Sequence, residues 1–144
     1  MIADIELEYD SPIPDYCGSC QKCIEACPTD AIVSEYVLDS SKCLSFLTIE
    51  NRENAIPEPE AHHMEGWIYG CDICQNVCPW NISFEHATDD PPFEAREANV
   101  NRDLIDWLGL SVHEYRERFR HSPVKRAKYE GLQRNVRAAL GQQM

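Results

Sequence analysis

The eight cysteines are the residues whose spacing points most directly to a chemistry, and they form two related motifs. The motifs are Cys17-x2-Cys20-x2-Cys23-x3-Cys27-Pro28, and Cys71-x2-Cys74-x3-Cys78-Pro79 with Cys43 placed between the two. Cysteines two residues apart on a tight loop can each bind a different iron of a cubane, and a run of four followed by proline is typical of two-cluster ferredoxins. The pattern therefore predicts two [4Fe–4S] clusters and one-electron transfer.

The fourth cysteine of each motif is expected to bind the other motif's cluster, as it does in bacterial two-cluster ferredoxins. The second motif repeats the first with one cysteine displaced, so Cys43 is expected to supply the missing ligand from a distance. The predicted ligands of the first cluster are Cys17, Cys20, Cys23 and Cys78. The predicted ligands of the second cluster are Cys27, Cys43, Cys71 and Cys74.

Zinc and disulfides are the two alternatives to iron–sulfur clusters. Zinc sites usually join pairs of Cys-x2-Cys across a long gap, which a repeated run of cysteines followed by proline does not match. The sequence shows no signal peptide and no apolar run near the ~20 residues of a membrane span, so we expect a cytoplasmic protein with no membrane partner. Disulfides are rare in that compartment, and clusters are favoured.

Charge divides the chain into two unequal parts. Residues 1–112 hold 5 Lys and Arg against 22 Asp and Glu, a net charge of −17. Residues 113–144 hold 8 against 3, a net charge of +5. The two parts are expected to face different partners or each other. An acidic field around the clusters also predicts low potentials, and so an external low-potential reductant.

Short elements are expected to position the cysteines. Residues 31–33 and 36–38 suit two short strands, followed by a turn at 39–42. Residues 43–50 are apolar and could form a helix or a strand, because periodicity does not decide between them. Residues 51–65 are predicted to be a loop followed by a short helix.

The pattern becomes helical after residue 100. Asn101 is expected to cap a helix that ends at Gly109 and carries an apolar face of Leu104, Ile105 and Leu108. The next segment opens with the Ser-x-x-Glu of a capping box at residues 111–114. A third helix is predicted to start at Ser122-Pro123 and to run towards residue 140.

These elements predict an α+β fold of two parts. Residues 1–98 are predicted to form a bacterial two-[4Fe–4S] ferredoxin-like domain that ends in an acidic linker over residues 82–98. Residues 99–144 are predicted to form a basic α-helical tail. One interpretation of this organisation is a free-standing dicluster ferredoxin-type electron carrier with a helical docking tail. A simple carrier, however, has no need for a basic helical extension beside an acidic cluster domain.

Several longer motifs carry a resemblance to a known family. They are Cys17-Gly-Ser-Cys20 with Cys27-Pro-Thr-x-Ala-Ile32, Cys43-Leu-Ser-Phe-Leu-Thr-Ile-Glu50, Tyr69-Gly-Cys71-Asp-Ile-Cys74-Gln-Asn-Val-Cys78-Pro-Trp-Asn81, and, in the tail, Tyr115-Arg116-x2-Phe119-Arg120 with Gly131-Leu-Gln-Arg134-Asn135-Val-Arg. In this order, and over nearly the whole chain, they resemble the iron–sulfur half of the epoxyqueuosine reductase family. The Thr-Ile-Glu, Gly-Cys-Asp-x-Cys-Gln and Cys-Pro-Trp-Asn stretches are more specific than the cysteines alone.

The resemblance implies an oxidoreductase of tRNA modification in the cytoplasm. The family reduces epoxyqueuosine to queuosine in tRNA, with cobalamin as the reactive cofactor and the clusters delivering single electrons to cobalt. Its members usually end in a HEAT-like helical repeat, which the helices from residue 101 would begin. They also carry an N-terminal cobalamin-binding domain with the proton donor. Since this chain starts just before the first motif, we expect a fragment, a subunit of a split enzyme that receives that domain in trans, or a module reused as an electron carrier after the domain was lost.

Cofactor and tRNA contacts follow as expectations from the same resemblance. Ser45, Thr48, Glu50 and Gln75 are predicted to face the cobalamin beside the second cluster. Tyr69, Asp72, Trp80 and Asn81 could do the same or could hold the cluster loops in place. Phosphate contacts to tRNA are predicted for Arg116, Arg120, Lys125, Arg126, Lys128 and Arg134, which could instead form a solvated helix face or pair with the acidic half.

Overall fold

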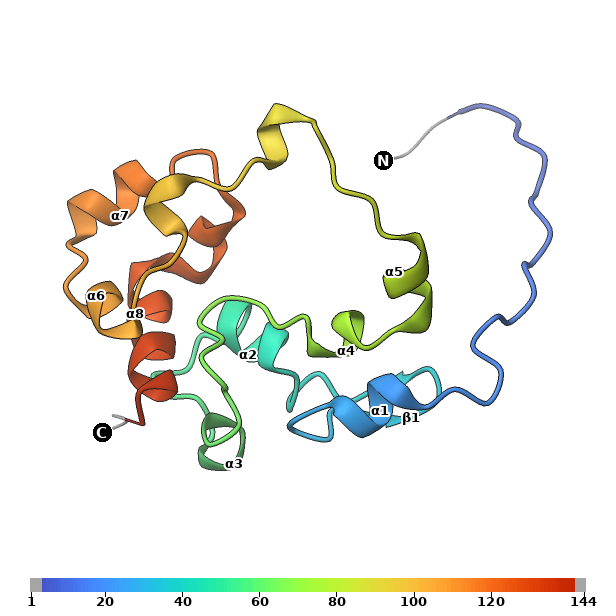
Figure 1. Ribbon diagram of the computed structural model, residues 1–144, viewed down its shortest axis with the longest axis horizontal. Coiled ribbons are helices and arrows are strands. Elements are labelled where there is room, and N and C mark those ends of the chain that lie inside the picture. The colour runs from blue at the N-terminus through green and yellow to red at the C-terminus, as the bar shows by residue number, and fades with distance from the viewer. Residues whose placement is uncertain (1–3, 142–144) are drawn as a thin grey trace.

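The fold is described by a computed structural model, which covers residues 4–141 (Figure 1). The helices and strands are α1 (Lys22–Ala26), β1 (Ile32–Ser34), β2 (Val37–Leu38), α2 (Leu44–Ile49), α3 (Glu58–Ala61), α4 (Ile73–Asn76), α5 (Pro79–Phe84), α6 (Leu104–Leu108), α7 (Val112–Arg118) and α8 (Lys128–Ala139), with 3-10 turns η1 (Pro91–Phe93), η2 (Glu97–Asn99) and η3 (Pro123–Ala127). The predicted domains extend to residues 1 and 144, whose ends lie outside the described residues.

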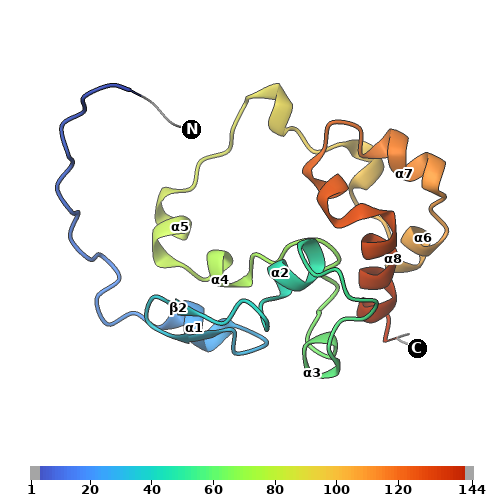
Figure 2. The same cartoon turned by 180° about the vertical axis from the view of Figure 1, so that it is seen from behind.

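The cysteine-bearing elements and the C-terminal helices occupy opposite sides of the molecule. Figure 1 shows α1, β1, α4 and α5 on one side, α6, α7 and α8 on the other, and α2 between them. The segment after α5 arches from the first side to the second, and Figure 2 shows the same arrangement from behind. The cluster motifs are therefore connected to the tail in two ways. The chain segment after α5 links them, and α2 lies between them.

The hairpin β1–β2 confirms the two predicted strands. It is antiparallel, with Ile32 opposite Leu38 and Ser34 opposite Val37 and an irregularity between the two pairs. Tyr36 turns the chain with a φ of 58°. In the described residues this hairpin is the only sheet, so the ferredoxin-like part is mostly helix and loop.

The segment 43–50, which the sequence leaves open, is the helix α2. Leu44, Leu47 and Thr48 recur at the spacing of one helix face and are buried. The two leucines pack with Ile56, Ala61 and Met64, and with Ala138 from α8, in the first hydrophobic core. Residues 51–57 are a loop that leads into α3, as predicted. A terminal helix thus completes the core under the cluster motifs.

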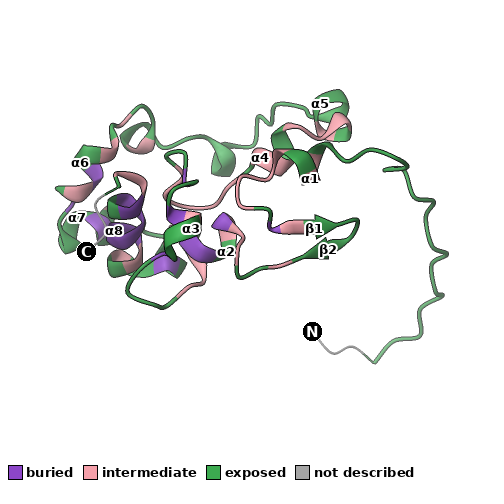
Figure 3. Cartoon of the chain, turned by 90° about the horizontal axis from the view of Figure 1, so that it is seen from below, coloured by how far each residue is buried: buried purple, intermediate pink, exposed green. Residues whose placement is uncertain are grey.

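A second core forms within the C-terminal helices. It consists of Trp107, Leu110, Tyr115, Phe119, Leu132 and Val136. Figure 3 shows the buried residues gathered on α8, α2 and the helices around them, whereas the cysteine-bearing side is mostly intermediate or exposed. Because α8 contributes to both cores, the division between residues 98 and 99 stays a prediction.

The predicted start of α6 is wrong, and its predicted apolar face is right only in part, since Leu108 packs against the second core and Leu104 is half-buried. The N-cap residue is Asp103 rather than Asn101, which adopts a φ of 54° before the helix begins. Ile105 is 57% exposed, and the buried residue of the helix is Trp107. The large indole packs on Phe119 with ring centroids 6.1 Å apart, so Trp107 lies at the centre of the buried face, with Leu108 packed against the same core.

The capping box of α7 is confirmed. The Ser111 hydroxyl accepts from the Glu114 N–H at 3.2 Å, and the Glu114 carboxylate accepts from the Ser111 N–H at 2.8 Å. The predicted third helix starts at Ser122 but is divided into η3 and α8. The division falls at Lys128, which has a φ of 62° that a continuous helix does not allow.

Loss of this cap gives a first prediction. Ser111→Ala is expected to lower the free energy of unfolding by about 1 kcal/mol, because the hydroxyl that accepts from the Glu114 N–H and donates to the Glu114 carboxylate is lost, while the bond from the Ser111 N–H remains possible. Urea unfolding followed by circular dichroism measures the change. Ser111→Asn is the matched control, since asparagine caps equally well, and an equal loss in both variants would contradict the capping role.

The helices are too short or too polar to cross a membrane. None of those formed by residues 4–141 combines the length and the apolar character that crossing a bilayer requires. The longest of them, α8, spans twelve residues and carries charged side chains. It packs instead on the two hydrophobic cores.

Candidate functional site

Four cysteines surround a cavity of about 400 Å³ at one end of the molecule. They are Cys17, Cys20, Cys23 and Cys78. The first pair lies on a turn in which the Cys20 N–H donates to the Cys17 carbonyl at 3.0 Å. Gly18 allows this turn through a φ of 52°. Cys23 lies on α1, and Cys78 immediately precedes α5.

The other four cysteines line a second cavity of about 650 Å³. They are Cys27, Cys43, Cys71 and Cys74. Cys27 ends α1, Cys43 precedes α2, and Cys74 lies on α4. The structure therefore brings the cysteines together in the two sets that the spacing predicts, and each set takes one cysteine from the opposite motif.

Three cysteines share one extended backbone conformation. Cys43 and Cys78 both have a φ of −68° and a ψ of 121°, and Cys27 has values of −67° and 115°. Proline follows Cys27 and Cys78 and favours this conformation, whereas Leu44 follows Cys43. Cys43 thus has the same local backbone conformation as the fourth cysteine of each motif, although it is followed by leucine.

The thiols of the second cavity interact electrostatically. Burial raises the pKa of Cys71 and of Cys74, and neighbouring thiolates of the same set raise both pKa values further. The pKa of Cys27 is lowered: burial opposes the shift, but hydrogen bonds to its sulfur outweigh it, including one from the Ala31 N–H at 3.2 Å. Because like charges repel, four thiolates this close together need a cationic centre that offsets their negative charge.

The two cysteine sets suit clusters better than single ions. Among residues 4–141, no three His, Cys, Asp or Glu side chains converge as the ligands of one metal ion do. Ligands of a cubane stay further apart, because each thiolate binds a different iron. The donor set, all sulfur and four to a cavity, therefore fits [4Fe–4S] clusters.

The four residues predicted to face cobalamin divide into two kinds. Ser45 and Gln75 line the second cavity. Thr48 is fully buried, and its hydroxyl donates to the Leu44 carbonyl at 2.7 Å. Glu50 accepts a hydrogen bond from Arg126, which lowers the pKa of its carboxyl group. Only the first two side chains are placed to meet a ligand beside the second set.

The predicted tRNA contacts also divide. Arg116, Arg120, Lys125, Arg126 and Lys128 are exposed on the tail. Arg134 is only 8% exposed and donates to the carbonyls of Leu47, Asn51 and Glu53 at 2.8 to 2.9 Å. Its guanidinium group therefore makes its hydrogen bonds inside the molecule and does not face solvent as the other five side chains do.

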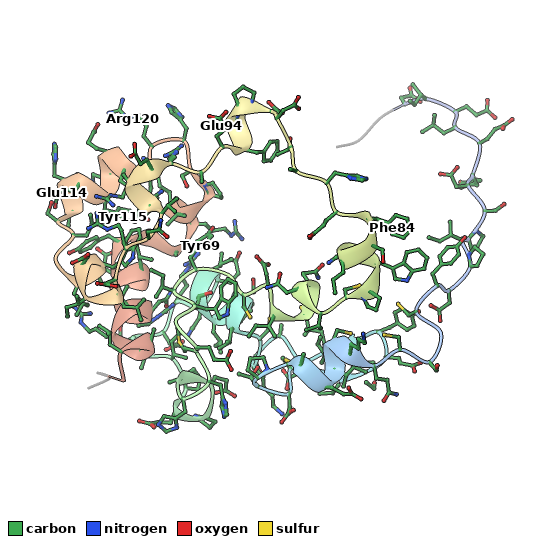
Figure 4. All side chains as sticks on the ribbon, in the orientation of Figure 1. Tyr69, Phe84, Glu94, Glu114, Tyr115 and Arg120 are labelled. Carbon is green, nitrogen blue, oxygen red and sulfur yellow. The ribbon has the colours of Figure 1, made fainter. Side chains whose placement is uncertain are left out.

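The tail is held against the cluster motifs by further contacts. The Tyr69 hydroxyl donates to the Pro123 carbonyl at 2.7 Å, which joins the segment before Cys71 to η3. Figure 4 shows Tyr69 on the side of the cluster region that faces the tail. The acidic part and the basic tail are also joined by an ion pair between Glu50 and Arg126, so some of their opposite charges neutralise each other within the chain.

Aromatic residues cover the first cavity, and two of them were missed by the sequence analysis. Trp80 donates from Nε1 to the Tyr16 carbonyl at 3.1 Å, and its ring stacks on Phe84 with centroids 5.3 Å apart. All three residues line the cavity. The spacing of four residues between Trp80 and Phe84 on α5 was the available signal. Trp80 therefore lines the cavity of the first set and not that of the second.

Comparisons with known proteins identify the same region. A family model described as a 4Fe-4S double cluster binding domain matches residues 16–81. An epoxyqueuosine reductase of Synechocystis sp. is 41% identical over 140 residues, which are 97% of this chain and 48% of the relative. The chain thus spans about half the length of the curated relatives that it matches.

Solved structures give the same result. The epoxyqueuosine reductase of Bacillus subtilis is 35% identical and superposes with a TM-score of 0.83 over 94% of this chain and 36% of that one. A second epoxyqueuosine reductase, solved with an epoxyqueuosine-modified tRNA stem loop, is 36% identical and has a TM-score of 0.83 over 94% of this chain and 35% of that one. By sequence and by structure, the chain is similar to the iron–sulfur part of epoxyqueuosine reductases.

Proposed function

We propose that the chain is the electron relay of an epoxyqueuosine reductase and passes single electrons to cobalamin for the reduction of epoxyqueuosine to queuosine in tRNA. The observation that carries the proposal is the division of the eight cysteines between two adjacent cavities, four to each. Each [4Fe–4S] cluster, when bound, supplies one-electron transfer. The family that the chain resembles supplies the destination of those electrons.

The proposed ligands follow the two cavities. Cys17, Cys20, Cys23 and Cys78 hold the first cluster, and Cys27, Cys43, Cys71 and Cys74 hold the second. Because α1 carries Cys23 and ends at Cys27, one short helix holds ligands of both clusters and fixes them close together. That proximity supports transfer of an electron between the two.

The second cavity is the proposed side of electron exit. Ser45 and Gln75 line it and can donate hydrogen bonds to a polar cofactor edge, which supports a cobalamin bound there by the rest of the enzyme or by a domain supplied in trans. Cys17 and Cys20 are exposed at the first cavity, which supports entry of electrons there from an external low-potential reductant. As tRNA modification requires, the proposed location is the cytoplasm.

The basic tail is the proposed tRNA contact, as the beginning of a HEAT-like region. The exposed side chains that support it are Arg116, Arg120, Lys125, Arg126 and Lys128. A related protein of known structure was solved with a modified tRNA stem loop. Arg134 is left out of this surface because it binds backbone carbonyls inside the molecule.

A reconstitution experiment tests the function. The chain, reconstituted anaerobically, is expected to hold about eight iron and eight labile sulfide. Mixed with the cobalamin-binding half of the Synechocystis relative, a reductant and epoxyqueuosine-containing tRNA, it is expected to form queuosine, whereas that half alone is not. If the chain holds its clusters but binds neither cobalamin with that half nor tRNA, it is a free-standing electron carrier and the proposal fails.

Charge removal on the tail gives a prediction about tRNA. Arg116→Ala with Lys125→Ala is expected to weaken binding of an anticodon stem loop and to reduce the slope of log K against log salt by about one for each phosphate that is no longer neutralised. A fluorescence anisotropy titration at several salt concentrations measures both quantities. Lys42→Ala, on the cluster side, is the control, and equal weakening by all three substitutions would contradict a specific basic surface.

A further inference from the structure

A buried hydroxyl joins the two segments from which the ligands Cys43 and Cys71 emerge. The Thr48 hydroxyl donates to the carbonyl of Leu44, the residue after Cys43, at 2.7 Å. The same oxygen accepts from the N–H of Gly70, the residue before Cys71, at 3.0 Å. One side chain thus bonds to the neighbour of each ligand.

A second side chain, that of Asn135, joins the same two segments at residues further from the two cysteines. Asn135, on α8, donates from Nδ2 to the Thr48 carbonyl at 2.7 Å and to the Ile68 carbonyl at 2.9 Å. Its Oδ1 accepts from the Arg134 guanidinium at 2.8 Å, which orients the amide group. Asn135 and Thr48 are both fully buried. Hydrogen bonds in such a place are costly to leave unmade, so they fix the geometry.

We propose that Thr48 and Asn135 are positioning residues for the second cluster. Together they set the distance between the Cys43 and Cys71 segments, and through Asn135 the C-terminal helix α8 determines the shape of a cluster site about ninety residues earlier in the chain. The inference rests on the proposed assignment of the second cluster. It gives the helical tail a role in electron transfer beyond any contact with tRNA.

The first cluster has a separate support, which makes the proposal selective. The Cys17 N–H donates to Asp15, and the Tyr16 carbonyl accepts from Trp80 on α5. The bond from Trp80 joins the segments of Cys17 and Cys78 without using α8. Although α1 is shared by both cluster sites, the links made by Thr48 and Asn135 are to the segments of Cys43 and Cys71, so weakening them is expected to act first on the second cluster.

The test compares variants that keep shape and change hydrogen bonding. Thr48→Val removes the hydroxyl with little change in volume, Thr48→Ser keeps it, and Asn135→Asp keeps the acceptor for Arg134 but removes the donor. The release of iron from the reconstituted full chain is followed with a ferrous chelator. The two clusters are distinguished by electron paramagnetic resonance, with Cys27→Ser and Cys78→Ser as references for single-cluster signals.

Thr48→Val and Asn135→Asp each remove two hydrogen bonds inside the molecule. Both variants are expected to release half of the iron about tenfold faster, the factor that results when each of the two lost bonds contributes near the lower end of the usual net range. The faster half is expected to be the second cluster, with an altered resonance, while Thr48→Ser behaves as the unsubstituted chain. Equal acceleration for both clusters, as global unfolding would cause, overturns the proposal, and so does an unchanged release rate. An unsubstituted chain that holds no iron would instead refute the proposed function.

Discussion

Cys27→Ser is expected to remove the second cluster and to leave the first in place, although Cys27 belongs to the first motif in the sequence. The reason is the lining of the cavities: Cys27 lies with Cys43, Cys71 and Cys74, whereas Cys78 lies with the cysteines of the first motif. The iron content is expected to fall from about eight to about four per chain. Metal analysis and electron paramagnetic resonance of the reduced protein measure the loss and identify the cluster that remains.

The reciprocal variant is the control for this result. Cys78→Ser is expected to remove the first cluster and to keep the second, with the same fall in iron content. The two single-cluster proteins therefore show different resonances. If Cys27→Ser and Cys17→Ser abolished the same signal, the ligands would follow the order of the sequence and the crossed assignment would be wrong.

The cysteine sets could be predicted from the sequence because the ligand geometry is mostly local. Loops with two intervening residues place neighbouring thiols close together, and a proline after the fourth cysteine favours the extended backbone that turns it away. Cys43 lacks such a proline, but its place in a repeat of the first motif was enough to pair it with the second set. The family resemblance also followed from local motifs, and the comparisons confirm it.

The tertiary roles of single polar residues could not be predicted in this way. Thr48, Glu50 and Arg134 are polar residues in motifs that carry the family resemblance. The resemblance predicted cobalamin contacts for the first two and a tRNA contact for the third. The structure places the first in a buried hydrogen bond, the second in an ion pair and the third among backbone carbonyls. Nothing local distinguishes these roles, because the partners lie up to 87 residues away.

Aromatic side chains account for other differences between prediction and structure. The face of α6 was assigned from its aliphatic residues, but Trp107 lies at the centre of the buried face, with Leu108 packed against the same core. The cover of the first cavity by Tyr16, Trp80 and Phe84 joins residues 64 positions apart, which periodicity within one helix does not reveal.

Charge patterning was informative about the tail but incomplete. The acidic and basic parts were expected to face different partners or each other, and the ion pair between Glu50 and Arg126 shows that they face each other at one point. The remaining basic residues of the proposed tRNA surface are exposed. Helix α8 contacts α2 and η3, and Lys128 of the proposed tRNA surface lies on it, so its attachment to α2 matters for both proposed sites.

Arg134→Met is expected to detach this helix, with a loss of about 3 to 5 kcal/mol in the free energy of unfolding. The guanidinium group bonds to the carbonyls of Leu47, Asn51 and Glu53, and methionine fills a similar volume without a donor for any of them. Burial already lowers the pKa of Arg134, as expected where water is excluded from a charged group. Urea unfolding of the reconstituted chain, followed by circular dichroism, measures the loss.

Arg137→Met is the matched control, because Arg137 lies on the same helix one turn later and is exposed. Its substitution is expected to change the free energy of unfolding by no more than about 0.5 kcal/mol. Arg134→Lys is expected to fall between the two, since an ammonium group can reach some of the carbonyls but lacks the planar fork that reaches all three. If Arg134→Met instead left stability unchanged and weakened tRNA binding, Arg134 would be a phosphate contact after all, and helix α8 would be held by its apolar face alone.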